Sequence, residues 1–375
     1  MTARQDAAPP VIETRGLAKR YRRVTALTDC TITVPEGRIS ALIGANGAGK
    51  TTLLRMLAGL ARPSDGDVTV LGGTPRQDPA FLAGIGFLAQ EVPLYRRLSA
   101  EDHIRAGAHL NPCWDGVSVR ERLTTLTIPL DRAVGTLSGG QRSQVALALT
   151  LAKRPRLLLL DEPVAALDPL ARRNFLAILA DAVAAGGLTV VLSSHLVADL
   201  ERVCDHIIML AASRVQLCGD IDTVLAEHQI LVGRRKDTSA IERDHRVVQI
   251  TRTPRQVTML VRLNGPVIDP AFQTSDVGLE ELVLAYMGQD APSALAQLTS
   301  IGDDQRAGSS GGCTARSCTS PPHCSPRSPS CCWSPACRWR RSTTPRSPPA
   351  ARATAAAPSA ARYSSAAMRS ASWSS

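Results

Sequence analysis

Residues 44–51 read Gly-Ala-Asn-Gly-Ala-Gly-Lys-Thr, and this segment constrains the fold of the chain more than any other. It follows an apolar run, residues 38–43, that predicts a strand, and it precedes residues 52–60, which predict a helix. Glycines let a backbone wrap so that its N–H groups point inward and, together with the helix N-terminus, bind phosphate oxygens. In this pattern Lys50 reaches the β- and γ-phosphates of a nucleotide, and the Thr51 hydroxyl is a ligand for Mg²⁺. The segment therefore predicts a strand–loop–helix unit that binds a nucleotide.

A second pair of glycines stands at the expected start of another helix. Residues 137–141 read Leu-Ser-Gly-Gly-Gln and are followed by a helical run over residues 142–153. Ser138 is a favoured N-cap residue, and Gly139 and Gly140 leave room for a phosphate beside the N–H groups of the first turn. We interpret this helix start as a second phosphate-binding element.

Two acids follow the next apolar run. Residues 157–163 read Leu-Leu-Leu-Leu-Asp-Glu-Pro, which predicts a buried parallel strand that ends at Asp161 and Glu162. Asp161 is placed to hold a metal ion, and Glu162 is placed to polarise an attacking water molecule. A further apolar strand is predicted over residues 188–192, and Ser-Ser-His follows it, with the histidine at His195.

In this order and spacing, the segments resemble the nucleotide-binding domain of ABC transporters over residues 11–219. The resemblance implies an α/β fold: a P-loop NTPase core of ABC type with an antiparallel β subdomain and a small helical subdomain at about residues 91–135. Residues 220–290 contain short β-rich pieces at 229–232, 246–251 and 256–262, and then an amphipathic helical run at 278–286. They predict a small α+β C-terminal extension, which resembles that of bacterial drug- and lipid-type export ATPases.

The resemblance also implies a role for each matching residue. ATP is expected to contact the phosphate loop, residues 44–52, and the signature motif, residues 137–141, while Tyr21 stacks on the adenine ring. The residues implied to bind ATP are Tyr21, Gly44, Asn46, Gly47, Ala48, Gly49, Lys50, Thr51, Thr52, Ser138, Gly139, Gly140, Gln141 and Asp168. The implied ligands of Mg²⁺ are Thr51, Gln90 and Asp161, and the implied catalytic residues are Glu162, His195 and Gln90. The sequence departs from the family at Ala45, where proline is commonest.

The same family resemblance implies partners. Two such domains pair head to tail, so that each ATP lies between the phosphate loop of one and the signature motif of the other. One set of motifs is present, so a second ATPase subunit is expected, and a homodimer is its simplest source. A separate transmembrane permease is expected to dock near residues 93–98, and the short segment 91–135 favours an exporter over an importer. The sequence does not indicate the transported substrate.

Charge and hydropathy limit the other classes of partner. The net charge is +10, but all ten arginines from Arg306 onward lie in a stretch without lysine or acids, so residues 1–305 carry 33 basic and 33 acidic side chains. We therefore expect no nucleic-acid partner. No apolar run approaches the ~18 residues that span a bilayer, and residues 1–10 lack a secretory signal pattern. We expect a cytoplasmic protein that lies on the inner face of the cell membrane through its permease.

The last part of the chain has an unusual composition. Residues 291–375 predict a low-complexity, disordered tail, since no Leu, Ile or Val follows Ile301 and six of the ten cysteines lie beyond residue 312. The cysteine spacings fit no common zinc pattern. The abrupt change at about residue 305 suggests a coding sequence read in the wrong frame, and we expect the tail to be dispensable for ATP hydrolysis.

Two alternative functions stay open on sequence grounds. One is a soluble ABC ATPase that acts on nucleic acid or ribosomes, although the chain has neither long heptad repeats nor a second ATPase cassette. The other is a nucleotide binder with a degenerate site, against which the intact Lys50, Glu162 and His195 argue.

Overall fold

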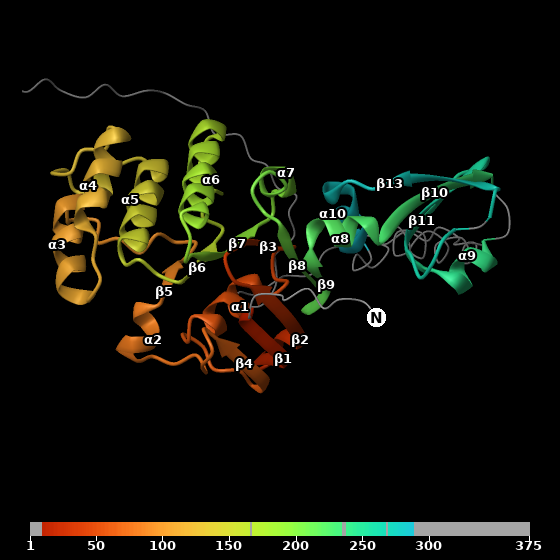
Figure 1. Cartoon of the computed structure of the whole chain (residues 1–375), viewed down its shortest axis with the longest axis horizontal. Coiled ribbons are helices and arrows are strands. Elements are labelled where there is room, and N and C mark those ends of the chain that lie inside the picture. The colour runs from red at the N-terminus through yellow and green to blue at the C-terminus, as the bar shows by residue number, and fades with distance from the viewer. Residues whose placement is uncertain (1–9, 166, 235–237, 268, 289–375) are drawn as a thin grey trace, which may run out of the picture. The chain divides into compact units, whose positions relative to one another are not determined.

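The computed structural model describes residues 10–165, 167–234, 238–267 and 269–288 (Figure 1). All of these residues belong to one compact unit, Met1–Gly308, and a second unit comprises Ser309–Ser375. The second unit lies outside the described residues, as does the tail predicted for residues 291–375.

A six-stranded sheet forms the centre of the described unit. Its strands, in spatial order, are β5 (Ile85–Leu88), β6 (Leu157–Asp161), β7 (Thr189–Ser194), β3 (Ile39–Gly44), β8 (His206–Ala211) and β9 (Arg214–Asp220). The first five are parallel, and only β9 runs antiparallel to its neighbour. Every residue of β3, β6, β7 and β8 is buried, as continuous aliphatic runs in parallel strands require. The predicted buried parallel strand after residue 156 is confirmed.

A separate three-stranded antiparallel sheet covers the phosphate-loop helix. Its order is β2 (Val24–Pro35), β1 (Pro10–Tyr21) and β4 (Asp65–Val70), and the helix is α1 (Lys50–Leu57). The helix α2 (Pro79–Ala83) precedes β5. Leu27 of β2, Leu54 of α1 and Leu159 of β6 lie in one hydrophobic cluster, so this sheet and α1 pack on one face of the central sheet. The expected antiparallel β subdomain is present.

Three helices lie side by side in Figure 1: α3 (Ala100–Leu110), α4 (Gly116–Thr125) and α5 (Gly139–Ala152). A 3-10 turn, η1 (Val134–Thr136), leads into α5. Ile104, Val119, Leu123 and Val145 form their shared apolar core. α5 begins directly after Ser138, which caps it as the sequence predicted.

Helices α6 (Pro169–Ala184) and α7 (Val197–Leu200) pack on the other face of the central sheet. Phe175 of α6 and Leu200 of α7 share a buried cluster with Leu160 and Leu192 of the sheet. Each helix follows one of the central strands, so it begins near the carboxyl edge of the sheet.

The C-terminal extension contains a four-stranded antiparallel sheet with three helices. Its elements are α8 (Ile221–Ala226), β10 (His228–Arg234), α9 (Ser239–Asp244), β11 (Arg246–Arg252), β12 (Gln256–Arg262), β13 (Phe272–Asp276) and α10 (Leu279–Gly288), with strand order β11-β12-β10-β13. The three predicted β-rich pieces correspond to β10, β11 and β12, and the predicted helical run corresponds to α10. Leu279 and Leu282 of α10 belong to the same cluster as Met209 of β8, so the extension shares a hydrophobic core with the central sheet.

No helix within the described ranges is both long enough and apolar enough to cross a membrane.

Candidate functional site

The phosphate loop joins the end of β3 to the start of α1, and two of its glycines are required by their surroundings. Gly49 has φ 105°, which L-residues rarely adopt, and a Cβ there would lie 2.5 Å from the Ala26 carbonyl oxygen. A Cβ on Gly44 would lie 2.4 Å from the carbonyl oxygen of Leu210. The loop is thus held tightly between β2 and β8.

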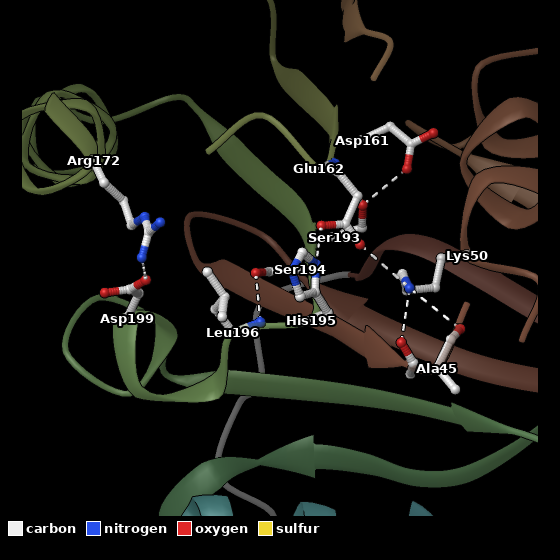
Figure 2. Close-up of polar contacts among 11 residues, drawn as sticks. Ala45, Lys50, Asp161, Glu162, Arg172, Ser193, Ser194, His195, Leu196 and Asp199 are labelled. Carbon is white, nitrogen blue, oxygen red and sulfur yellow. Dashed lines mark hydrogen bonds and ion pairs between the residues drawn. The ribbon is translucent and has the colours of Figure 1, made fainter. Parts of the chain in front are cut away.

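Lys50, the first residue of α1, is 6% exposed. Its Nζ donates to the carbonyl oxygens of Gly44 at 2.7 Å and Ala45 at 3.4 Å (Figure 2). It also lies 3.3 Å from Oε1 of Glu162. This contact is an ion pair without hydrogen-bond geometry, because Glu162 Oε1 has no hydrogen-bond partner among the described residues. The loop therefore holds a buried ammonium group beside a buried carboxylate.

The two predicted acids stand at the carboxyl end of β6. Asp161 is its last residue, and Glu162 follows with φ 50° and 9% exposure. Ser193, which pairs with Asp161 across β6 and β7, donates from Oγ to Asp161 Oδ1 at 2.9 Å. Ser193 Oγ also accepts the Glu162 N–H at 2.8 Å. One hydroxyl thus contacts both acids.

His195 reaches this group from the loop after β7. Its Nδ1 lies 2.8 Å from Glu162 Oε2, and its side chain is 50% exposed (Figure 2). Glu162 therefore stands between His195 and Lys50. The arrangement can neutralise a bound anion through Lys50 and can present a carboxylate, oriented by an imidazole, to a water molecule.

A cavity of about 380 Å³ opens beside the loop. It is lined by Val24, Thr25, Ala26, Ala45, Asn46, Gly47, Gly49, Lys50, Thr51, Thr52, Gln90 and Glu162. A second cavity of about 740 Å³ is lined by residues that include Gln90, Gly139, Arg142, Ser143, Glu162 and Pro163. Gln90 and Glu162 line both cavities, so they stand where the loop region meets the start of α5.

Several predicted residues lie apart from the loop cavity or have other contacts. The residues described as lining that cavity do not include Tyr21, Gly44, Ala48, Ser138, Gly139, Gly140, Gln141, Asp161, Asp168 or His195. Asp168 caps α6 by accepting the N–H groups of Leu170 and Ala171, and Gln141 Oε1 accepts the N–H of Ser138 in a capping box.

Tyr21 lies near the loop cavity without lining it. It pairs with Val24, which does line the cavity. The Nζ of Lys19 lies 4.9 Å from the centre of the Tyr21 ring. A base stacking on Tyr21 would therefore use the ring face opposite Lys19.

The residues predicted to hold a metal ion carry the oxygen atoms that suit a hard cation. Thr51 and Gln90 line the loop cavity, and the Asp161 carboxylate is anchored by Ser193. A hydroxyl, an amide and a carboxylate are the donors that Mg²⁺ accepts, with nucleotide phosphates completing its shell. Within the described part of the chain, no three His, Cys, Asp or Glu side chains group as a metal site.

The sequence reasoning missed Ser193 and the residues of β2 that line the loop cavity, Val24, Thr25 and Ala26. The only available signal for Ser193 was its place two residues before His195. The pattern gave no reason to choose its hydroxyl over that of Ser194, which accepts the N–H of Leu196.

The sequence is similar to known ATP-binding proteins of ABC transporters. A family model described as "ABC transporter" matches residues 27–165. The "Phosphonates import ATP-binding protein PhnC 2" of Pseudomonas savastanoi pv. phaseolicola is 37% identical over 231 residues, covering 56% of this chain and 83% of the relative. The "Nickel import ATP-binding protein NikO" of Rhodobacter capsulatus is 37% identical over 241 residues, covering 59% and 94%.

The fold agrees as well. The solved "Structure of ATP binding subunit of ABC transporter" superposes with a TM-score of 0.53 at 28% identity, covering 58% of this chain and 92% of that chain. The predicted ABC-type P-loop fold is confirmed. The chain belongs to the ATP-binding proteins of ABC transporters, a family of ATPases coupled to transport.

Proposed function

We propose that this chain binds ATP with Mg²⁺, hydrolyses it in the cavity beside Lys50, and drives transport through a separate permease from the cytoplasmic face of the membrane. The observation that carries the proposal is the approach of Lys50, Glu162 and His195 at the carboxyl ends of three neighbouring strands. Binding sites of open α/β sheets lie at this edge.

Each side chain has a distinct task in this proposal. The loop N–H groups and Lys50 bind the phosphates, while Thr51, Gln90 and Asp161 supply oxygen ligands for the metal ion. Mg²⁺, when bound, neutralises charge on the transferring phosphoryl group. Glu162 takes the proton of the attacking water molecule, and His195 holds the Glu162 carboxylate in position through their 2.8 Å contact.

We further propose that two copies pair head to tail. The first turn of α5 carries the backbone N–H groups of Gly139 and Gly140, which would bind phosphate in this proposal. These two glycines leave space there, since the nearest atom to a Cβ at either position would be a side-chain atom at 3.4 Å or more. The residues lining the loop cavity of the same chain do not include Ser138 among those described. In the paired state Ser138–Gln141 and Asp168 of one copy would serve the ATP of the other.

Mixing two inactive variants tests this pairing. Lys50→Ala removes the phosphate contact within one chain, and Ser138→Arg blocks the element that serves the partner's ATP. Each variant alone has two damaged sites, whereas a mixed dimer has one intact site. We expect each variant to hydrolyse ATP at a few per cent of the wild-type rate or less, and a mixture to regain activity. We expect Ser138→Arg monomers to keep wild-type nucleotide affinity and Lys50→Ala monomers to lose it.

Ser99→Arg is the control for loss of a helix cap, because Ser99 forms the same kind of capping box at the start of α3. It should retain activity. If Lys50→Ala and Ser138→Arg lost nucleotide binding equally in the monomer, the head-to-tail assignment would be wrong.

The direction of transport is a separate proposal. The short helical subdomain, with α3 and α4 between residues 91 and 135, and the C-terminal extension favour export. The two relatives described above are import proteins by name and do not support export. ATP-driven accumulation of an amphiphilic dye in inside-out vesicles that contain the chain and its permease would support export, and ATP-driven release of preloaded solute would establish import.

A further inference from the structure

Ser193 contacts both acids at the end of β6, although neither the motif pattern nor the proposed mechanism uses it. Its Oγ donates to Asp161 Oδ1 at 2.9 Å and accepts the N–H of Glu162 at 2.8 Å (Figure 2). We propose that Ser193 is a positioning residue for ATP hydrolysis, which fixes the metal-binding carboxylate and the catalytic acid with one hydroxyl. The proposal rests on the roles assigned above to Asp161 and Glu162.

Burial fixes the orientation of this hydroxyl. Ser193 is 0% exposed and Asp161 is 1% exposed, so water does not compete for either group. A serine hydroxyl has one hydrogen, and here it is committed to the Asp161 carboxylate while a lone pair receives the Glu162 N–H. Because Asp161 and Ser193 are register partners on adjacent strands, the sheet itself sets this geometry.

The contact to Glu162 supports an unusual backbone conformation. Glu162 has φ 50°, in the left-handed region that residues other than glycine seldom occupy. Loss of the Ser193 oxygen would leave a buried N–H without an acceptor, and the chain would relax to restore a partner. Such relaxation would move the Glu162 carboxylate relative to His195, 2.8 Å away, and Lys50, 3.3 Å away.

The contact to Asp161 acts on the metal ion instead. A hydrogen bond to one carboxylate oxygen orients the other, and removal of such supporting bonds lowers metal affinity by about 10- to 100-fold in other proteins. The Lys50 contacts to Gly44 and Ala45 do not involve Ser193. Nucleotide binding without metal should therefore be independent of Ser193, whereas metal dependence and turnover should not.

The experiment compares Ser193→Ala, Ser193→Thr and Thr14→Ala in the full-length chain. Thr14 is the matched control: it is 1% exposed, its Oγ1 donates to the Cys30 carbonyl oxygen at 2.8 Å, and it accepts the Ile32 N–H at 3.1 Å, in the antiparallel sheet. Trinitrophenyl-ATP binding is titrated in EDTA and again at increasing Mg²⁺, and ATP turnover and melting temperature are measured alongside.

For Ser193→Ala we expect the Mg²⁺ concentration that gives half of the maximal effect on trinitrophenyl-ATP binding to rise about tenfold. We expect kcat to fall at least tenfold and the affinity for trinitrophenyl-ATP in EDTA to stay unchanged. Ser193→Thr, which keeps the hydroxyl, should restore both. Thr14→Ala should lower the melting temperature but leave both near wild type.

Wild-type Mg²⁺ dependence and kcat in Ser193→Ala would overturn the proposal. If Ser193→Ala lost as much nucleotide affinity in EDTA as in Mg²⁺, the proposal would also be overturned, because the loss would then indicate a structural role only. Glu162→Gln separates this proposal from the proposed function: if Glu162→Gln hydrolyses ATP normally, the catalytic assignment fails. If Glu162→Gln is inactive and Ser193→Ala is normal, only the role of Ser193 fails.

Discussion

At the scale of single residues, the polar contacts of the site converge on Glu162. His195 contacts one carboxylate oxygen, Lys50 lies near the other, and Ser193 accepts the backbone N–H. Burial makes these contacts stronger than they would be in water, and it makes each of them costly to remove. The His195 side chain is half-exposed, whereas Lys50 and Glu162 are buried side chains that line the loop cavity.

The role of His195 as an orienting group can be tested by His195→Ala. The variant should keep nucleotide affinity, because His195 is not among the described residues that line the loop cavity. Turnover at saturating Mg-ATP should fall by about 10²-fold, since the carboxylate loses its orienting partner. His109→Ala, at an exposed position on α3, is the control. Retention of more than half of the wild-type turnover would exclude the orienting role.

At the scale of secondary-structure elements, an ion pair joins α6 and α7, the helices that follow β6 and β7. Arg172 of α6 donates to Asp199 of α7 at 2.7 Å (Figure 2). A second Arg172 nitrogen donates to the Leu167 carbonyl oxygen at 3.4 Å. The Arg172 and Asp199 side chains are 20% and 32% exposed, so solvent screens the pair only in part. The pair links the loop before α6 to the helix after His195.

A double-mutant cycle with Arg172→Ala and Asp199→Ala should give a coupling free energy of about 1 kcal/mol in urea unfolding. The same cycle on Arg154 and Asp115, a pair at 2.8 Å whose arginine is 71% exposed, should give a smaller value. A coupling no larger than that of this control pair would contradict the expectation that the partly buried pair contributes more to stability.

Apolar patterns in the sequence indicate some of these elements and not others. Continuous apolar runs identified β6 and β7, and β-rich composition identified β12. β13 has one buried residue, Phe272, and α8 and α9 have six residues each, too few for a helical period to be recognised. Family motifs pointed to the loop, Glu162 and His195, which lie together in the structure. The contacts of Ser193 were not predictable, because they depend on the register between β6 and β7 and on the conformation of Glu162.

At the scale of the whole molecule, buried histidines make stability depend on pH. His206 of β8 is 4% exposed, and its Nδ1 has no hydrogen-bond partner among the described residues. Burial, together with the nearby positive charge of Arg38, lowers the pKa of His206 from 6.5 to about 4, although Asp220 acts in the opposite direction. The folded chain therefore binds this proton less readily than the unfolded chain does.

A lowered histidine pKa stabilises the fold fully above about pH 6.5, and this contribution is lost as the pH falls toward 4. We expect His206 to account for roughly 2 kcal/mol of the stability lost between pH 7 and pH 5. His206→Asn should show a smaller loss over the same interval, measured by urea unfolding at both pH values. An identical pH dependence in the variant and the wild type would contradict this assignment.

The most direct test of the whole account is the rate of ATP hydrolysis by Glu162→Gln. The substitution keeps the size of the side chain but removes the charge that we propose activates water, and it leaves the residues proposed to bind phosphate, the loop and Lys50, unchanged. Hydrolysis should fall by about 10²–10⁴-fold with Mg-ATP binding retained, and the ATP-bound variant should elute as a dimer in size-exclusion chromatography. Asp161→Asn should instead lose metal-dependent affinity. Hydrolysis by Glu162→Gln at the wild-type rate would contradict the account.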